Sequence, residues 1–391
     1  TGVGAAAPAA GLMPYDGPLK PGDAVGVNFV TGDLQLGGTG TVTHIDGDRV
    51  YAFGHPMYNL GPIEFPMTRA YVYTVLPSLF SSTKLSTTGE TIGTLLQDRA
   101  TAIAGRLGPP PKMVPVTLEL TSERGASNTF KFDVVRDQLF TPLMTYSALL
   151  QTLTSYERQF GTTTYEVRGT ATLRDHGTVS FDNIFSGDNV ATPASTSIIG
   201  PITALITNDA EPVDIEKLDL HFKSGEQVKS ATLERAWIDD PRPRPGKTVP
   251  VKMLLRTFRG EDLLKTLPIE IPANATGSLS LIIQDGQRLQ SAEQRELRLP
   301  QRRTVDQLVK SMNRARRNDT LYLKLMSGDA GAVINGEALS SLPPSVLAVM
   351  ESDRTGGTFN ALSSATLGEW SLDTDLAVSG TRTLSLSLAS N

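Results

Sequence analysis

The feature that most constrains the fold is the frequent interruption of the chain by residues that turn the backbone. The 391 residues include 35 glycines and 25 prolines, and many segments between them are short and alternate apolar with polar side chains. Alternation places every second side chain on one face of a strand, whereas an amphipathic helix needs a repeat of three to four residues. The sequence therefore predicts a mainly β protein, and its length predicts two or three domains.

Alternating segments predict strands and hairpins along most of the chain. The turn Asp46-Gly47-Asp48 lies between two such segments and predicts a β-hairpin, and Glu123-Arg124-Gly125 predicts a second one. Regular short strands between turn signals predict an immunoglobulin-like β-sandwich at 211–300. The strands are expected at 24–30, 40–45, 49–53, 114–120, 129–135, 163–173, 178–184, 214–222, 230–238, 248–258, 277–284, 321–326 and 383–388.

A few segments depart from strand alternation. Apolar residues at helical spacing predict a helix at 141–158. Thr304 and Gln307 form a capping box ahead of an apolar stripe and predict a second helix there. The C-terminal part, 301–391, is therefore expected to be a small α+β segment, with a short helix at 345–350. The basic residues after the capped helix are interpreted as structural charges near the negative pole of its dipole: Arg314, Arg316 and Arg317.

Two segments are expected to lack regular structure. Residues 1–18 are small and rich in proline, so they predict a flexible tail or linker. The uncharged run 189–208 contains Pro193 and Pro201 and predicts a buried or surface-hugging loop.

Composition excludes several classes of function. The chain has no cysteine, which removes disulfides, cysteine zinc sites, iron–sulfur clusters and thiol nucleophiles. The net charge is −5 without long runs of one sign, so no nucleic-acid partner is expected. No apolar run approaches the roughly 20 residues of a membrane span. No metal or cofactor is expected, because the four histidines form no i, i+2 or i, i+4 pair and no phosphate-binding glycine loop is present.

His55 is the most informative candidate for chemistry. It follows an expected strand within Ala52-Phe53-Gly54-His55-Pro56, and Pro56 disfavours helical backbone at the histidine. The strand end therefore presents the imidazole. The other histidines carry weaker signals: His44 and His221 lie inside expected strands, and His176 lies in a turn.

The segment around His55 resembles the SpoIVB-type serine peptidase family. The resemblance rests on Gly40-Thr41-Val42-Thr43, the following hairpin and Phe53-Gly54-His55, then on Glu90-Thr91-Ile92-Gly93-Thr94-Leu95, Ala102-Ile103-Ala104-Gly105 and the strand pair at 113–135. It covers about 20–136, a third of the chain. It implies a chymotrypsin-like β-barrel domain, placed at 19–210, an extracytoplasmic location, and His55 in the position of the catalytic histidine.

The chain departs from this family at the nucleophile. The family's Gly-Met-Ser-Gly-Ser-Pro segment and its triad aspartate are absent, and no Gly-x-Ser-Gly occurs in the sequence. The glycines of that motif let the backbone form an oxyanion hole beside the serine. Ser186 is the candidate nucleophile outside the motif, with Asp182 or Asp175 as orienting groups. The alternatives lie in a polar loop not far in sequence from His55: Ser81, Ser82 and Ser86.

Three hypotheses follow for function. The first is an extracytoplasmic protein, periplasmic, surface-bound or secreted, whose peptidase-like domain is inactive and binds a protein or peptide partner or assembles with itself. The second is a serine endopeptidase that uses His55 with a nucleophile outside the usual motif. The third is a structural subunit of a surface assembly. Thr1 is either a processed N-terminus or a fragment boundary.

Overall fold

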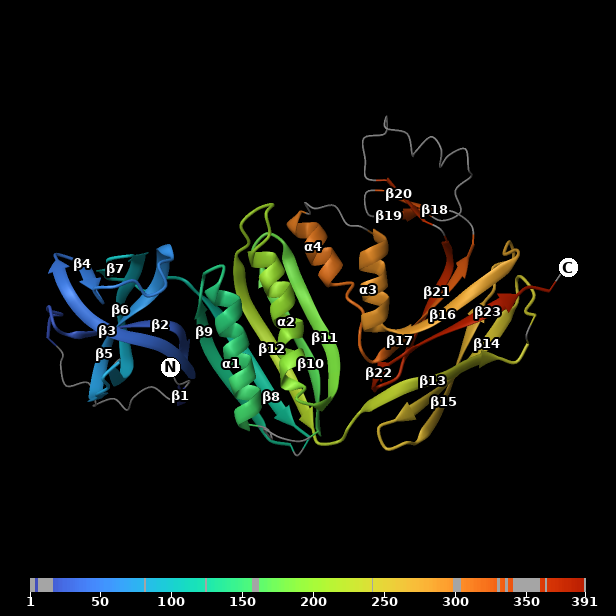
Figure 1. Cartoon of the computed structure of the whole chain (residues 1–391), viewed down its shortest axis with the longest axis horizontal. Coiled ribbons are helices and arrows are strands. Elements are labelled where there is room, and N and C mark those ends of the chain that lie inside the picture. The colour runs from blue at the N-terminus through green and yellow to red at the C-terminus, as the bar shows by residue number, and fades with distance from the viewer. Residues whose placement is uncertain are drawn as a thin grey trace.

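The chain is mainly β and is arranged as three units in a row (Figure 1). The computed structural model describes residues 17–80, 82–123, 125–156, 162–240, 242–297, 304–328 and 364–389, with short strands at 4–5, 331–334, 337–339 and 359–362. A barrel stands at one end, a helix-covered sheet in the middle and a pair of sheets at the other end. The expectation of a mainly β protein is confirmed.

Six antiparallel strands close the first unit into a barrel. The pairing runs β2–β3–β4–β7–β6–β5 and returns to β2, so these six strands form a ring. The expected hairpin at 46–48 is confirmed, since Asp46 pairs with Arg49. The strands are β2 (Ala24–Gly32), β3 (Leu34–Asp46), β4 (Arg49–Ala52), β5 (Gly61–Leu76), β6 (Thr83–Arg99) and β7 (Ala102–Leu107).

The middle unit is an open sheet that continues from the barrel. β9 (Ser127–Val135) pairs with β2 and is followed by β8 (Met113–Ser122), β12 (Ile215–Gly225), β10 (Thr162–Leu173) and β11 (Gly177–Asp188). The contact of β8 with β12 is parallel and the others are antiparallel. Among the described strands no pairing leads from β11 back to β9, so the sheet stays open.

Two helices lie side by side on one face of this sheet, α1 (Phe140–Tyr156) and α2 (Ala191–Ile206) (Figure 1). The first confirms the helix predicted at 141–158. The second shows that the loop predicted at 189–208 is wrong. Helical spacing brings Ala194, Ile198, Ile202 and Leu205 into the core, where each is fully buried. Pro193 lies in the first turn of α2, where the backbone N–H groups have no partner within the helix, so it removes no hydrogen bond. Pro201 lies inside the helix and removes one, and the burial of the apolar side chains outweighs that loss.

The capped helix predicted after Thr304 is present as α4 (Val305–Met312). The Thr304 side chain accepts from the backbone N–H of Gln307, and the Gln307 side chain accepts from the backbone N–H of Thr304. Val305 and Val309 are buried in the core that α1 and α2 share with the barrel and the open sheet. This helix thus covers the outer end of the middle unit, next to α2 and β11.

The third unit consists of two four-stranded sheets that share one apolar core. The first has the order β15–β14–β13–β22, with β13 (Ser230–Ile238), β14 (Thr248–Thr257), β15 (Asp262–Glu270) and β22 (Ala377–Ser379). The second has the order β21–β17–β16–β23, with β16 (Ser278–Asp285), β17 (Thr320–Ser327), β21 (Ala365–Asp373) and β23 (Thr381–Ser387). The helix α3 (Gly286–Leu297), which the sequence pattern did not indicate, follows β16 directly.

Strand pairing groups the chain differently from the expected ranges. β12 lies beyond 210 but pairs with β8 and β10 in the middle unit. The second sheet of the third unit takes β17, β21 and β23 from beyond 300. Alternation along a strand reports its exposed and buried faces but not its partners, so it does not indicate this grouping.

Some expectations fall on other parts of the chain. The short helix expected at 345–350 and most of the tail at 1–18 lie outside the described residues. The small strands β18 (Gly331–Ile334), β19 (Glu337–Leu339) and β20 (Phe359–Leu362) form a third sheet of the C-terminal part. Within the described residues no helix has both the length and the apolarity to span a bilayer.

Candidate functional site

His55 lies on a sharp turn that leaves the barrel wall after β4. The two residues before it, Phe53 and Gly54, both have left-handed backbone, with φ of 75° and 73°. Glycine adopts this conformation freely, but for a bulky residue such as phenylalanine it carries strain that its surroundings must offset. The turn thereby directs the imidazole of His55 away from the barrel core, and the side chain is exposed.

The ring of Phe53 holds this turn against β3. A Cβ atom added to Gly40 would lie only 2.1 Å from Cδ1 of Phe53. The ring therefore packs directly over the glycine backbone. The backbone N–H of Phe53 donates to the carbonyl of Thr41 at 2.9 Å. The phenyl ring in turn contacts the His55 imidazole, with 5.7 Å between ring centroids. Glycine at position 40 is therefore what allows the turn to lie flat on the barrel.

A buried carboxylate fixes the loop that follows His55. Asp98, near the end of β6, is fully buried and accepts from the backbone N–H groups of Met57 and Tyr58 at 2.8 Å each and of Leu60 at 3.2 Å. Three donors converge on one side chain, which is the kind of arrangement that satisfies a buried carboxylate. The pairing of Gly61 with Asp98 places that carboxylate beside the loop.

Aromatic contacts join the same loop to the first helix. The ring of Tyr58 lies 5.1 Å from that of Phe140, the first residue of α1, and 6.2 Å from that of Phe29 in the barrel. Phe140 is buried, yet Tyr58 itself remains 57% exposed. Leu139, in the turn before α1, and Leu143 on α1 are also exposed apolar side chains. We refer to His55 and Tyr58 of this loop, together with Leu139 and Leu143 near Phe140 in the sequence, as the His55 surface.

The His55 ring bonds to its own loop. Its Nδ1 lies 2.8 Å from the carbonyl oxygen of Pro56. This is the hydrogen bond that the ring makes among the described residues. A carbonyl only accepts, so in the neutral ring Nδ1 carries the proton and Nε2 is left as an acceptor. The exposed ring can therefore accept a hydrogen bond from a ligand.

Ser186 lies away from His55, on β11 at the outer edge of the middle sheet (Figure 1). Its hydroxyl bonds to that of Thr164 at 2.7 Å and accepts from the backbone N–H of Lys229 at 2.8 Å. The proposed orienting groups also lie in the middle unit: Asp182 on β11 and Asp175 in the β10–β11 turn. The structure does not bring any of these residues to His55.

The serines after β5 make local contacts. The Ser86 hydroxyl pairs with that of Thr39 at 2.6 Å, and the Ser82 hydroxyl accepts from the backbone N–H of Ser78 at 3.4 Å. Ser81 lies outside the described residues. Neither described hydroxyl bonds to the imidazole of His55.

The remaining histidines lie on three different elements. His44 contacts the ring of Tyr51 on the barrel surface, and Nε2 of His221 lies 3.2 Å from the Thr121 hydroxyl. His176 joins the β10–β11 turn to α4, with 2.9 Å between its Nδ1 and a carboxylate oxygen of Asp306. No group of metal-ligating side chains converges among the described residues.

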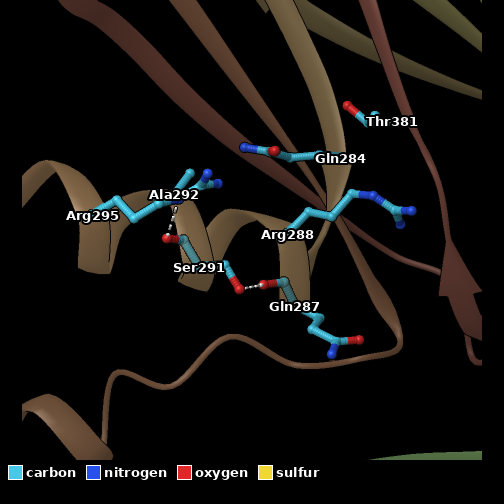
Figure 2. Close-up of a pocket in the computed structure, with 7 residues that line it drawn as sticks. All are labelled: Gln284, Gln287, Arg288, Ser291, Ala292, Arg295 and Thr381. Carbon is cyan, nitrogen blue, oxygen red and sulfur yellow. Dashed lines mark hydrogen bonds between the residues drawn. The ribbon is translucent and has the colours of Figure 1, made fainter.

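An open groove of about 480 Å³ lies beside α3, with Thr381 of β23 on its other side (Figure 2). Two guanidinium groups line it, but both have partners in the protein. Arg288 forms an ion pair with Asp285, and Nε of Arg295 donates to the carbonyl of Ser291 at 3.1 Å. An anion site needs cations that are free to bind the ligand, so this groove is a weaker candidate than the His55 surface.

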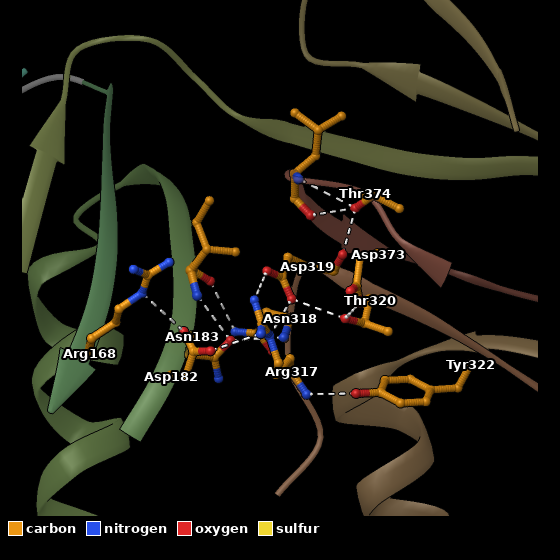
Figure 3. A network of polar contacts seen from close by, with 12 residues as sticks. Arg168, Asp182, Asn183, Arg317, Asn318, Asp319, Thr320, Tyr322, Asp373 and Thr374 are labelled. Carbon is orange, nitrogen blue, oxygen red and sulfur yellow. Dashed lines mark hydrogen bonds and ion pairs between the residues drawn. The ribbon is translucent and has the colours of Figure 1, made fainter. Parts of the chain in front are cut away.

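A polar network joins the middle unit to the third unit (Figure 3). Arg317 lies between Asp182, at 2.8 Å, and Asp319. The side-chain oxygen of Asn183 accepts from the backbone N–H of Asn318 at 2.8 Å. Arg316 binds Glu293 and Glu369, so the structural interpretation of these two arginines agrees with their contacts.

The chain was compared with protein-family models, with curated proteins and with solved structures. None of the three comparisons finds a match. The candidate site therefore stands on its own geometry.

Sequence reasoning found His55 but missed the residues around it. Asp98 lies in Gln97-Asp98-Arg99, which looks like any polar strand end, and only the pairing of β5 with β6 shows its role. Tyr58 had a usable signal, because a large aromatic residue in a loop rich in glycine, proline and asparagine needs a packing partner. The exposure of Leu139 and Leu143 depends on how α1 docks, which the sequence does not report.

Proposed function

We propose that this chain is an extracytoplasmic binding or assembly module built on a peptidase-like barrel that does not hydrolyse peptides. The His55 surface binds a segment of a protein or peptide partner. His55 supplies a hydrogen-bond acceptor, and Tyr58, Leu139 and Leu143 supply apolar contacts. Aromatic anchors beside a few polar groups are typical of sites that bind peptide segments.

The contacts of the His55 ring carry this proposal. In a serine peptidase one ring nitrogen donates to a carboxylate and the other takes the proton of the serine hydroxyl. Here Nδ1 is bonded to the carbonyl of Pro56, and Ser186 lies on β11 with its hydroxyl bonded elsewhere. The nearby carboxylate of Asp98 is occupied by the backbone of the loop. Among the described residues, this arrangement holds the histidine in place and supplies it with no carboxylate and serine for a proton relay.

The barrel supports the peptidase-like part of the proposal. His55 follows β4, the third strand of the barrel, and Asp98 lies at the end of β6, the fifth. A closed six-stranded barrel with a histidine after one strand and an aspartate near the end of another is consistent with one barrel of a chymotrypsin-like pair. We also propose that the two sheets of the third unit form an immunoglobulin-like sandwich, because they face each other across one core.

The binding test uses two leucines of equal exposure. Leu139 on the His55 surface and Leu264 on β15 are each 57% exposed. Peptides selected from a displayed random library on the wild-type protein should bind the Leu264→Ser variant unchanged. They should bind the Leu139→Ser variant about tenfold more weakly, because one apolar contact is lost.

The outcomes of this test are distinct. Selection of no peptide at all, or equal weakening by both substitutions, would contradict binding at the His55 surface. Thermal unfolding of both variants serves as the control for folding, and an exposed leucine should change the midpoint little in either case. Cleavage of the selected peptides would favour the endopeptidase hypothesis instead.

A further inference from the structure

The β5–β6 hairpin ends in a group of exposed apolar side chains. Leu79 and Phe80 at its turn are fully exposed, and four more apolar residues on its strands are about half exposed. We call these six residues the apolar tip: Tyr73, Val75, Leu76, Leu79, Phe80 and Leu85. They make up more than half of the large apolar side chains that are exposed in the described part of the chain. Such a concentration marks an interaction surface.

The apolar tip also differs from the other hairpin turns in charge. The sequence 70–83 contains no charged residue. The β3–β4 turn carries Asp46 and Asp48, and the β14–β15 turn carries Arg259 and Glu261 next to the exposed Phe258. Charged turns keep a projecting hairpin in water, and this hairpin alone among these three lacks them.

Polar and aromatic groups accompany the apolar side chains along the hairpin. Tyr71 and Tyr73 lie edge to face, with 5.0 Å between ring centroids. Lys84 lies opposite Val75 in the strand pair, and its ammonium donates to the hydroxyl of Thr41 at 2.8 Å. Closer to the barrel, Arg69 pairs with Glu90. Lys84 lies beside the apolar side chains near the turn, and the tyrosines lie further along the strand toward the barrel. Apolar side chains accompanied by a lysine and tyrosines are the groups found at a membrane interface.

We propose that the apolar tip inserts shallowly into the interface of a lipid bilayer. Two adjacent side chains at the turn are fully exposed, and the segment 70–83 has no charge to pair with a protein surface. Backbone pairing between β5 and β6 extends to Leu76 and Thr83, which satisfies the inner edges of both strands up to the turn. A lipid interface accepts such a tip without a matching pocket, and its depth suits the tyrosines. This inference does not depend on the function proposed for the His55 surface.

The test measures binding of the full chain to lipid vesicles by co-flotation. The vesicles are made of phosphatidylcholine alone or of equal parts phosphatidylcholine and phosphatidylglycerol. We expect the wild-type chain to bind both, with about fivefold stronger binding to the anionic vesicles because Lys84 lies beside Val75 in the tip. Phe80→Ser should weaken binding about tenfold, since one aromatic side chain no longer enters the interface. Phe258→Ser, at the charged β14–β15 turn, should leave binding unchanged.

A second measurement reports where the tip lies. A tryptophan introduced as Phe80→Trp should shift its emission to shorter wavelength on vesicle addition and be quenched by brominated lipid, while Phe258→Trp should show neither effect. Failure of the wild-type chain to bind either vesicle would overturn the proposal, as would equal effects of the two serine substitutions. A dimer that is lost in Phe80→Ser, without vesicle binding, would assign the tip to a second copy of the chain and would also overturn it.

Discussion

The carboxylate of Asp98 accepts a 2.8 Å hydrogen bond from the backbone N–H of Met57, two residues after His55. The same side chain also binds the N–H groups of Tyr58 and Leu60. A fully buried acidic residue on β6 thus sets the path of the loop that presents the histidine and carries Tyr58 to α1. The geometry of the His55 surface depends on this one side chain.

Replacement of Asp98 should loosen the loop after His55. In Asp98→Ala three backbone N–H groups lose their acceptor, and we expect the free energy of unfolding to fall by about 3 kcal/mol. Hydrogen exchange should show faster exchange at the amides of Met57, Tyr58 and Leu60. Glu64→Ala, an exposed position on β5, is the control and should change neither quantity. Unchanged exchange at these amides in Asp98→Ala would contradict the anchoring role.

The two glycines Gly38 and Gly40 on β3 should respond differently to alanine. A methyl group at Gly40 would overlap the ring of Phe53, whereas the nearest atom to one at Gly38 is Cγ1 of Val27 at 3.8 Å. Gly40→Ala should lower the free energy of unfolding by about 2 kcal/mol and displace the turn. Gly38→Ala should change it by less than about 0.5 kcal/mol. Urea unfolding compares the two, and equal effects would show that Phe53 does not pack on the strand as described.

The pKa of His176 should depend on α4. The hydrogen bond to Asp306 is the main cause that raises this pKa above its ordinary value of 6.5, and the charges of Glu211, Asp306 and Asp175 act in the same direction. The protonated ring is therefore favoured in the folded chain. Its stabilising contribution is complete below the unfolded pKa and is lost as pH rises through the higher folded pKa.

An NMR titration of the His176 Cε1–H signal checks this expectation. The wild-type midpoint should lie above 6.5, and Asp306→Asn should move it to lower pH, because the carboxylate that favours the charged ring is gone. Equal midpoints in the two proteins would show that the contact between the β10–β11 turn and α4 does not hold in solution.

The junction between the middle and third units should rely more on Asn183 than on the ion pair of Arg317 with Asp182. The Asn183 side chain accepts from the backbone N–H groups of Ile184 and Asn318, which would lose their partner in Asn183→Ala. That loss should cost about 1–2 kcal/mol. Arg317 and Asp182 are each exposed by 40% or more, so their ion pair should contribute less than about 1 kcal/mol. Asp182→Ala tests this pair because it leaves the contact of Arg317 with Asp319 in place. The free energies of unfolding of the two alanine variants are compared, and a larger effect of Asp182→Ala would contradict the prediction.

Local signals in the sequence predicted elements but not their partners. The capping box at Thr304 identified α4 because both of its hydrogen bonds form between residues three apart. The prediction of a loop at 189–208 is wrong because it rests on the two prolines rather than on the helical spacing of residues such as Ile198 and Ile202. The burial of these residues depends on α1 and the sheet, which the local sequence does not report. Closure of the barrel between β2 and β5 joins residues 40 or more positions apart, and no local pattern reports it.

In the candidate site, too, the sequence indicates a residue with a local signal but not the residues that the fold brings to it. His55 stood out because Gly54 and Pro56 flank it at a strand end. Asp98 did not, because a single aspartate at the end of a strand is ordinary until the fold buries it under the loop. The separation of Ser186 from His55 likewise depends on which sheet β11 joins, and that follows from its pairing with β10.

The most direct test of the central claim, that the barrel binds without hydrolysing, is the intact mass of the chain after incubation with a fluorophosphonate probe. Such a probe forms a covalent adduct with a serine that a histidine activates. We predict no adduct in the wild-type chain, because the His55 ring bonds to Pro56 and no described serine hydroxyl reaches it. One adduct per chain on a serine, lost in His55→Ala, would contradict the claim and establish a serine hydrolase.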